Sequence, residues 1–453
     1  MNKFDSIIIG SGVGGLSTAL LLANEGKKVL VLEKNELLGG RLTSYTRDGF
    51  TVDLGVHVIS RSNKGPLGEV FDRVGLETGL EFQKLRPVTS YNGKIFVFPH
   101  DLKDMMPEEE FNALMKFMVD IREMTDEEVS SYDDISIDEF LKKYTDNDMA
   151  SSCVFNMAQI YTCLSSWLVS AGEFMRCMRY EAAARASGYP IGGCGAITNA
   201  YVKAIESKGG EIKNNAKVDS IVIEDNRAVG VKVGDIIYEA DTVISNADIK
   251  ATVFNLVGQD YFDSDYIKYV KDLEYSWTGP VVRVALDEKI SDIKMLTQFG
   301  SLKQKEYYGN MEKGIMPDEL NLFLVCPSNF SPTVAPEGKQ LINFATPIPL
   351  GLPKNIVDNL QEAMIKTVEK YIPDLREHIL WMEYTTTNEL CASLGEMGAG
   401  IGIGQRVGQV GKKRPSNKTS IDGLYLVGAE AGGSGVGIEL AINSALELFD
   451  NYL

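Results

Sequence analysis

The chain of 453 residues is 44% hydrophobic and 24% charged, a globular composition that excludes the disordered, collagen-like and disulfide-stapled classes. Because hydrophobic cores tend to divide above roughly 250–300 residues, two lobes are expected. The 45 basic and 63 acidic residues give a net charge of −18, which argues against non-specific binding to nucleic acid or anionic lipid headgroups.

The cysteines and the apolar runs bear on where the protein works. Six cysteines are scattered without a C-x-x-C pair, so neither a metal site nor a dense disulfide framework is predicted. Reduced thiols in a cytoplasm are the expectation. Because no run approaches roughly 18 uninterrupted apolar residues, no transmembrane helix is expected, and peripheral membrane contact stays open.

The first 40 residues predict a strand at 6–9, a glycine turn at 10–15, a helix at 16–25 and a second strand at 28–32. Apolar residues recur at three-to-four-residue spacing in the helix, which gives it one face to lie on a sheet. The second strand is continuously apolar, as expected of a parallel strand buried on both faces. The pattern therefore predicts an opening βαβ unit.

The turn has the spacing Gly10-x-Gly12-x-x-Gly15 between a strand and a helix. Small residues let the backbone approach a pyrophosphate, whose charge then lies at the helix N-terminus. Glu33 ends the second strand, where a carboxylate can accept hydrogen bonds from ribose hydroxyls. The residues predicted to bind a dinucleotide here are Gly10, Gly12, Val13, Gly14, Gly15, Glu33 and Lys34.

The next motifs choose between NAD and FAD. Gly39-Gly40-Arg41 offers free backbone amides and a guanidinium group for phosphate oxygens, and the segment 49–57 ends in Gly55-Val56-His57. With this series the sequence resembles the FAD-dependent oxidoreductases of the phytoene desaturase and carotenoid isomerase branch of the flavin amine oxidase superfamily. The resemblance implies non-covalent FAD, contacted by Gly39, Gly40 and Arg41 and, at the flavin edge, by Gly55, Val56 and His57. It makes His57 the candidate catalytic residue, with packing as the alternative.

Residues 86–190 are expected to form a helical insertion that helps to bind the substrate. Its segment 149–178 is rich in Met, Cys and aromatic residues, so it either lines an apolar pocket or belongs to the ordinary core. A basic and aromatic cluster follows, formed by Arg176, Arg179, Tyr180 and Arg185. Arg179 and Tyr180 are its candidates for binding a substrate carboxylate or phosphate, and intramolecular salt bridges are the alternative.

Residues 191–258 are expected to return the chain to the first lobe, with strands at 217–224, 228–233 and 242–245. The resemblance places the backbone of Val218 at the adenine and adds Asn246 to the cofactor contacts. Residues 259–415 are expected to form the substrate lobe, with strands at 281–286, 320–325 and 340–346 and a helix at 354–371. The glycine-rich stretch 395–411 either approaches the flavin or is a plain loop.

Residues 416–453 are expected to complete the first lobe with a strand at 423–427, a glycine loop and a helix from about 437 to 448. This end resembles the C-terminal flavin motif of the same family, in which Glu430 stands where an Asp is usual. The positive end of the helix can stabilise negative charge on the reduced flavin. The flavin contacts that the resemblance implies are Gly428, Glu430, Gly435, Val436, Gly437 and Ile438.

The expected fold is α/β: a GR2-type Rossmann-like FAD-binding lobe, made of 1–85, 191–258 and 416–453, interrupted by a mixed α/β substrate lobe with a helical insertion. The leading hypothesis is FAD-dependent desaturation, saturation or isomerisation of an apolar polyene or lipid, with an unknown electron acceptor. One alternative is a flavin amine oxidase that oxidises a C–N bond, with Trp381 and Tyr384 as an aromatic pair at the flavin. Another is a binding or escort protein on the same scaffold.

Overall fold

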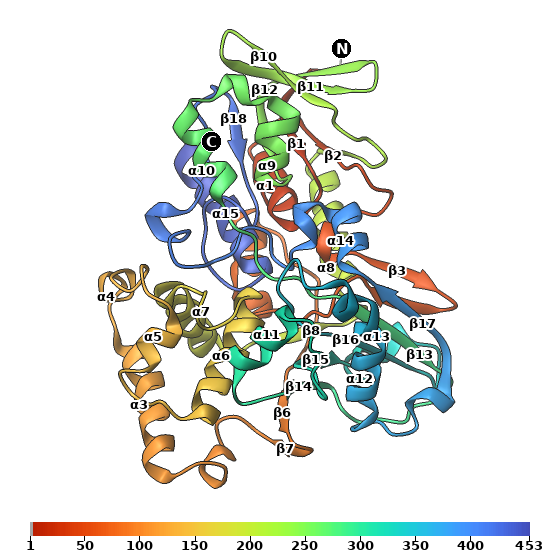
Figure 1. Cartoon of the computed structure of the whole chain (residues 1–453). Helices are drawn as coiled ribbons and strands as arrows, with labels where there is room; N and C mark the ends of the chain where they lie inside the picture. The colour runs from red at the N-terminus through yellow and green to blue at the C-terminus, as the bar shows by residue number, and fades with distance from the viewer. Residues whose placement is uncertain (1–2) are drawn as a thin grey trace.

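The computed structural model describes residues 3–453, apart from the side chains at 394 and 396, and divides them into two lobes (Figure 1). Each lobe is built on a seven-stranded sheet of its own. The upper lobe in Figure 1 contains the first strands and the last helix, and the lower lobe is formed by the middle of the chain. The chain thus has two sheets, each at the centre of one lobe.

The sheet of the upper lobe has the strand order β10-β11-β12-β1-β2-β9, and β18 also pairs with β12. Its core is parallel: Ile8 of β1 lies between Val31 of β2 and Ile244 of β12. The strands are β1 (Lys3–Ile9), β2 (Val29–Leu32), β9 (Glu211–Lys213), β10 (Ser220–Glu224), β11 (Arg227–Val233), β12 (Ile236–Ser245) and β18 (Leu424–Leu426).

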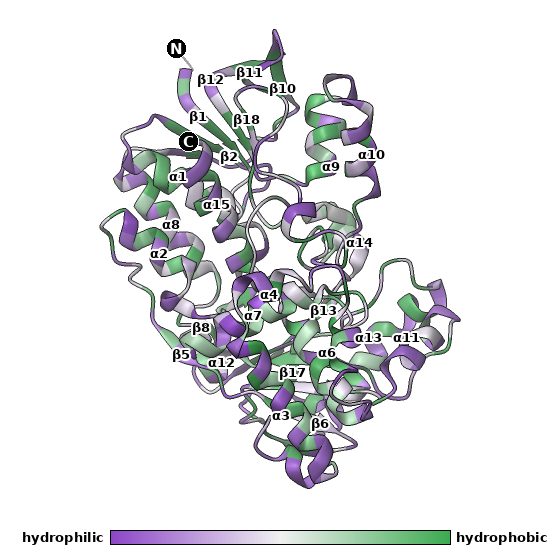
Figure 2. Cartoon of the chain, turned by 90° about the vertical axis from the view of Figure 1, so that its left-hand side faces the viewer, coloured by the Kyte–Doolittle hydropathy of each residue, from purple (hydrophilic) through white to green (hydrophobic). Residues whose placement is uncertain are grey.

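Both faces of this sheet are covered. Ile8 and Val31 pack with one group of helices, whereas Ile7 and Leu30 face a second hydrophobic cluster on the other side. Figure 2 shows the two helix layers on either side of the strands. This arrangement explains why the predicted second strand is continuously apolar. The first layer contains α1 (Val13–Asn24), α2 (Pro66–Arg73), α8 (Gly195–Ser207) and α15 (Ile438–Tyr452), and the second contains α9 (Ile249–Ala251) and α10 (Ser264–Asp272).

The sheet of the lower lobe has the order β17-β13-β16-β15-β14-β6-β7. The first strands of the expected helical insertion, β6 and β7, extend this sheet, because β6 pairs in parallel with β14. The start of that insertion is thus not helical, and the sequence did not predict β14 or β17. The strands are β6 (Val88–Tyr91), β7 (Lys94–Phe96), β13 (Val281–Leu286), β14 (Met295–Phe299), β15 (Leu322–Val325), β16 (Gln340–Ala345) and β17 (Ile379–Thr385).

The helical insertion and the lower sheet share one hydrophobic core. Phe155 and Phe174 from the insertion are buried in the same cluster as Phe344 and Leu360. The Met- and Cys-rich segment 149–178 belongs to this core, which is the second of the two interpretations that the sequence left open. The helices are α3 (Glu108–Glu123), α4 (Asp126–Ser130), α5 (Ile137–Leu141), α6 (Asp148–Thr162), α7 (Ala171–Ala184), α11 (Gln304–Glu312), α12 (Pro327–Phe330), α13 (Lys354–Glu369) and α14 (Thr387–Leu394).

Short strands connect the lobes. β5 (Phe82–Lys84) pairs with β8 (Gly188–Pro190), where the chain leaves the first lobe and returns to it. The hairpin of β3 (Ser44–Arg47) and β4 (Phe50–Asp53) reaches the lower lobe, where Phe50 packs edge-on against Trp381. Among the described residues, no helix is both long enough and apolar enough to span a bilayer.

Candidate active site

The glycine turn leads directly into α1, which begins at Val13 rather than at Leu16 as predicted. Its N-cap is Gly12, no side chain caps it, and no acidic residue lies in its first turn. The free backbone amides and the positive end of the helix dipole are therefore available to an anion. A Cβ on Gly14 would lie 2.8 Å from Cα of Gly428, which shows that the C-terminal loop packs directly on this turn.

Glu33 lies buried beside the turn. Its Oε2 accepts hydrogen bonds from the amide (2.9 Å) and the hydroxyl (2.8 Å) of Ser11, and its Oε1 accepts one from the amide of Asn35 (2.9 Å). The Ser11 hydroxyl oxygen accepts in turn from the amide of Gly39 at 3.0 Å. Ser11, which the sequence analysis did not single out, thus links the turn to the Gly-Gly-Arg segment. Lys34 is exposed.

The Gly-Gly-Arg segment is shaped by its glycines. Gly39 and Gly40 have φ values of 103° and 57°, a conformation that side chains disfavour, and the space beside Gly39 is filled by Thr198 of α8. Arg41 is half-buried, and burial lowers the pKa of its guanidinium group. One of its nitrogens donates to the carbonyl oxygen of Ala399 at 3.3 Å, which joins the segment to the glycine-rich stretch of the substrate region.

Two further predicted contacts come from the middle of the chain. Asn246 follows β12, and its amide group lies over the turn, since a Cβ on Gly12 would come within 2.6 Å of its Nδ2. Val218 is buried close to Glu33, because the amide of Ala216 donates to the Glu33 carbonyl oxygen at 2.8 Å. The fold therefore brings both residues to the carboxyl end of the sheet beside the turn.

The loop that carries Gly55, Val56 and His57 is held by a residue from the other lobe. Arg283 of β13, only 2% exposed, donates from Nε to the carbonyl oxygen of Asp53 at 2.8 Å and from Nη2 to that of Leu54. Its third nitrogen donates to the Thr385 hydroxyl at 2.7 Å. Sequence reasoning missed Arg283. The only sign of its role in the sequence is that a charged residue stands inside an otherwise apolar strand.

The carboxylate of Asp53 anchors the same loop from below. It accepts hydrogen bonds from the hydroxyls of Ser44 and Tyr189, both at 2.6 Å, and from the amide of Cys194 at 2.9 Å. His57 packs against Gly55, where a side chain would overlap its ring. Burial lowers the pKa of His57, and the nearby Arg41 and Arg283 add to this effect although Asp53 opposes it, so the imidazole is neutral at pH 7.

The C-terminal loop carries Glu430, whose carboxylate connects two distant segments. Oε2 accepts from the amide of Ile249 at 2.6 Å, and Oε1 accepts from the amide of Ile403 at 3.1 Å. Burial, with a smaller contribution from the neighbouring Asp248, raises the pKa of Glu430 to about 8. Both oxygens thus already bind backbone amides, so the ribityl or phosphate contact expected of Glu430 would have to use its remaining lone pairs.

The first turn of the helix after this loop contains the carboxylate of a buried ion pair. Gly435 and Gly437 adopt φ values of 129° and 52°, and α15 begins at Ile438, just after Val436 and Gly437. Glu439 in its first turn is buried and accepts a hydrogen bond from Nε of Arg61 at 2.6 Å. The helix end that we expected to face the flavin therefore also holds a buried carboxylate–guanidinium pair, which the sequence did not predict.

The residues of the basic cluster on α7 have different partners: two of its arginines form salt bridges, whereas its tyrosine stacks with another arginine. Arg176 pairs with Asp133 at 2.9 Å and with Glu173 at 3.0 Å, and Arg179 pairs with Asp126 at 2.8 Å. For these two arginines the structure has the salt bridges that were the alternative to substrate binding. Tyr180 differs, because its ring lies under the guanidinium group of Arg61, 4.7 Å from it.

The aromatic pair considered for an amine oxidase is not formed by Trp381 and Tyr384. The two residues are three positions apart in β17, so their side chains point to opposite faces of the sheet. Trp381 packs with Phe50 in a small cluster, whereas Tyr384 packs against the main core of the lobe. These residues therefore cannot face one ring together.

The arrangement fits FAD. An uncapped helix start, glycines without room for side chains, a buried carboxylate at the end of β2 and a second glycine loop packed on the first meet at one edge of the sheet. The family model for flavin containing amine oxidoreductases matches residues 13–287, more than half of the chain. The chain therefore belongs to this family and is an FAD-dependent oxidoreductase.

Similar proteins cover the chain almost completely. A 4,4'-diapolycopene oxygenase from a Methylomonas species is 25% identical and covers 96% of both chains. A chloroplastic prolycopene isomerase from Daucus carota is 26% identical over 94% of this chain and 76% of its own. A lycopene-forming phytoene desaturase from Pseudescherichia vulneris is 26% identical over 94% of each. The resemblance to the desaturase and isomerase branch is confirmed.

The fold is likewise found in solved structures. The crystal structure of an oxidoreductase from Methanosarcina mazei superposes with a TM-score of 0.77 over 99% of this chain and all of its own, at 21% sequence identity. At this identity the likeness shows the fold alone. It confirms the α/β fold expected from the sequence.

Proposed function

We propose that the protein carries out FAD-dependent redox chemistry at carbon–carbon bonds of an apolar polyene or related lipid, as desaturation, saturation or redox-neutral isomerisation. The observation that carries the proposal is the similarity to proteins named for carotenoid substrates, which extends through the substrate lobe as well as the cofactor motifs. When bound, FAD supplies the group that accepts or returns a hydride.

Within this proposal, His57 exchanges a proton at the flavin edge. Its neutral imidazole can accept a proton, and its buried Nδ1 has no hydrogen-bond partner in the described part of the chain. Arg283 and Asp53 act as positioning residues that fix its loop. The substitution His57→Gln should lower the rate of flavin reduction, whereas His378→Gln, at a histidine hydrogen-bonded to Asp287, serves as the matched control.

The amine oxidase alternative receives no support from the described residues, since the two aromatic side chains considered for it lie on opposite faces of β17. The escort alternative differs from the proposal in one measurable respect, because an escort protein does not change the redox state of its flavin.

We place the protein in the cytoplasm, an inference supported by its six unpaired cysteines.

The test begins with the absorbance spectrum of the purified protein and release of its chromophore by heat. The flavin is then titrated without oxygen against phytoene, lycopene and prolycopene in detergent, and separately against a panel of amines, with product isomers separated by chromatography. Bleaching of the flavin or a changed polyene supports the proposal. Bleaching by amines alone, or a flavin that stays oxidised with every compound while no polyene is changed, contradicts it.

A further inference from the structure

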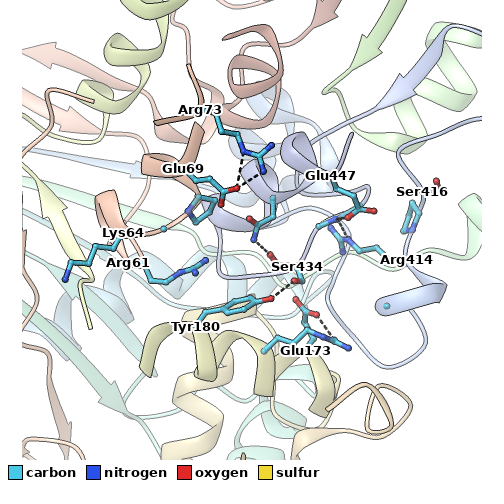
Figure 3. A pocket seen from close by; sticks show the side chains of 18 of the residues that line it. Arg61, Lys64, Glu69, Arg73, Glu173, Tyr180, Arg414, Ser416, Ser434 and Glu447 are labelled. Carbon is cyan, nitrogen blue, oxygen red and sulfur yellow. Dashed lines mark hydrogen bonds and ion pairs between the residues drawn. The ribbon is translucent and has the colours of Figure 1, made fainter. Parts of the chain in front are cut away.

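A polar cavity of about 910 Å³ lies on the outer side of the C-terminal glycine loop (Figure 3). Its walls come from α2, α7, α15 and the loops 411–416 and 432–434. Six cationic and four acidic side chains line it, which leaves a local charge of +2 in a chain whose net charge is −18. The cations are Arg61, Lys64, Arg73, Arg176, Lys412 and Arg414.

Most of the acidic side chains in the cavity already have partners. Glu69 is paired with Arg73 at 2.8 Å, and Glu447 accepts a hydrogen bond from the amide of Gly433 at 2.7 Å. Glu173 accepts from Gln405 at 2.7 Å and from the amide of Gly435 at 3.1 Å, besides its pair with Arg176. The exposed Asp72 is the remaining acid. The carboxylates of this cavity therefore do not neutralise its other cations.

Arg414 is the least compensated of those cations. Its Nε donates to the carbonyl oxygen of Gly432 at 2.6 Å and its Nη2 to that of Ala429, while Nη1 is buried and has no partner among residues 3–453. Burial lowers the pKa of Arg414, but a guanidinium group stays charged in proteins. Arg414 forms no salt bridge with any described residue, and Glu173, Glu430 and Glu447 act on it only at longer range, so a bound anion would offset the cost of its desolvation.

Arg61 presents a binding group to the same cavity. Glu439 holds its Nε, and the flat face of the guanidinium group stacks on the ring of Tyr180, so the group is fixed in orientation (Figure 3). Arg61 and Ser62 both have left-handed backbone conformations, with φ of 49° and 47°. Non-glycine residues adopt this conformation only when the surrounding structure enforces it. Lys64 and Lys412 add two exposed charges that form no ion pair within the described chain.

We propose that this cavity is a binding site for the oxyanion of a small molecule, either a carboxylate or a phosphate. A stacked guanidinium group suits such planar or tetrahedral oxyanions, and the unpaired charges around it supply the attraction. The site is distinct from the predicted cofactor site, because none of the residues that line the cavity is among those expected to contact the cofactor. The proposal does not depend on the polyene activity.

The test uses the FAD-loaded protein, so that the cofactor phosphates are already in place. Inorganic phosphate, octanoate and uncharged 1-octanol are titrated by calorimetry at low salt. The double variant K64E/K412E reverses two exposed charges without touching the core, and K313E reverses an exposed charge elsewhere as the matched control. We expect saturable binding of phosphate or octanoate that weakens about tenfold or more in K64E/K412E and is unchanged in K313E.

A second variant tests the fixed geometry of the site. Arg61→Lys keeps the charge beside Glu439 but loses the planar fork, so it should weaken binding of the oxyanion while the protein stays folded and flavin-loaded. Binding of phosphate alone identifies a phosphate ligand, and binding of octanoate but not octanol identifies a carboxylate. Absence of binding by both anions, equal binding of octanoate and octanol with no binding of phosphate, or equal weakening in K64E/K412E and K313E overturns the proposal.

Discussion

The glycine turn at 10–15, Glu33 and the segment 39–41 form what we call the nucleotide cradle. This cradle and the loop at 53–57 belong to one candidate site, yet they are held in different ways. The cradle is shaped by glycines and backbone amides that come from a segment of about 40 residues. The loop is fixed by the side chain of Arg283, which lies 230 positions from Asp53 in the sequence. The comparison teaches that backbone geometry shapes the part that we propose to bind the nucleotide, while long-range side-chain contacts fix the loop that we propose to lie nearest to the chemistry.

The largest effect is expected from removing the long-range contact. Arg283→Met would leave the carbonyl oxygens of Asp53 and Leu54 buried without donors, and we expect a loss of about 2–5 kcal/mol in the free energy of unfolding. Urea unfolding measures this loss, and visible circular dichroism reports the flavin environment. A variant with unchanged stability and an unchanged flavin signal would show that the loop does not need Arg283.

A second prediction concerns the pH dependence of the flavin-free protein. Burial raises the pKa of Glu430 to about 8, so between about pH 4.5 and 8 the unfolded chain loses a proton that the folded chain retains. This group therefore stabilises the fold at low pH, and its contribution is lost as the pH rises to 8. Stability should fall by on the order of 4 kcal/mol across that range.

Glu430→Gln should flatten this dependence, whereas Glu312→Gln, at an exposed glutamate, should leave it as it is. The slopes of unfolding free energy against pH are the quantity to compare, because the glutamine also alters the hydrogen bonds to Ile249 and Ile403. Parallel slopes in the wild type and Glu430→Gln would refute the assignment of the proton to this carboxyl group.

The cradle itself can be broken by a single methyl group. A Cβ on Gly15 would lie 2.5 Å from the carbonyl oxygen of Gly10, so Gly15→Ala should cost about 1–3 kcal/mol and reduce FAD occupancy, read from the ratio of flavin to protein absorbance. Gly309→Ala is the control, because nothing lies near its Cβ position and the helix should gain about 0.5–1 kcal/mol. Full FAD occupancy in Gly15→Ala would contradict the prediction.

The smallest effect is expected at Arg179. Its partner Asp126 is 91% exposed, and exposed ion pairs contribute about 0–1 kcal/mol. Arg179→Gln should therefore change thermal stability little and leave flavin reduction by the substrate as it was. A pronounced rise in the substrate concentration needed for half-maximal reduction would instead restore Arg179 as a substrate-binding residue.

Features that depend on residues close together in the sequence were predicted better than features that depend on residues far apart. The helix and strands of the first 40 residues lie within a few positions of the predictions, and the resemblance drawn from the glycine and arginine motifs identified the family. The strands β6, β7, β14 and β17 were missed or assigned to a helical region, because a strand in a mixed sheet is stabilised by neighbours far away in the sequence. The sequence analysis paired Trp381 with Tyr384 because it did not predict the strand β17, in which the two side chains point to opposite faces.

By itself, the sequence determined the βαβ opening, the glycine turns and the class of cofactor, since tight turns and close backbone approach need particular residues at fixed local spacing. The tertiary structure alone decided that Arg283 holds the loop of His57, that Glu430 joins the segments at 249 and 403, and that Arg61 pairs with Glu439. The reason is physical: a buried charged or polar group takes its partner from whichever segment the packing brings beside it, and no local spacing records that choice.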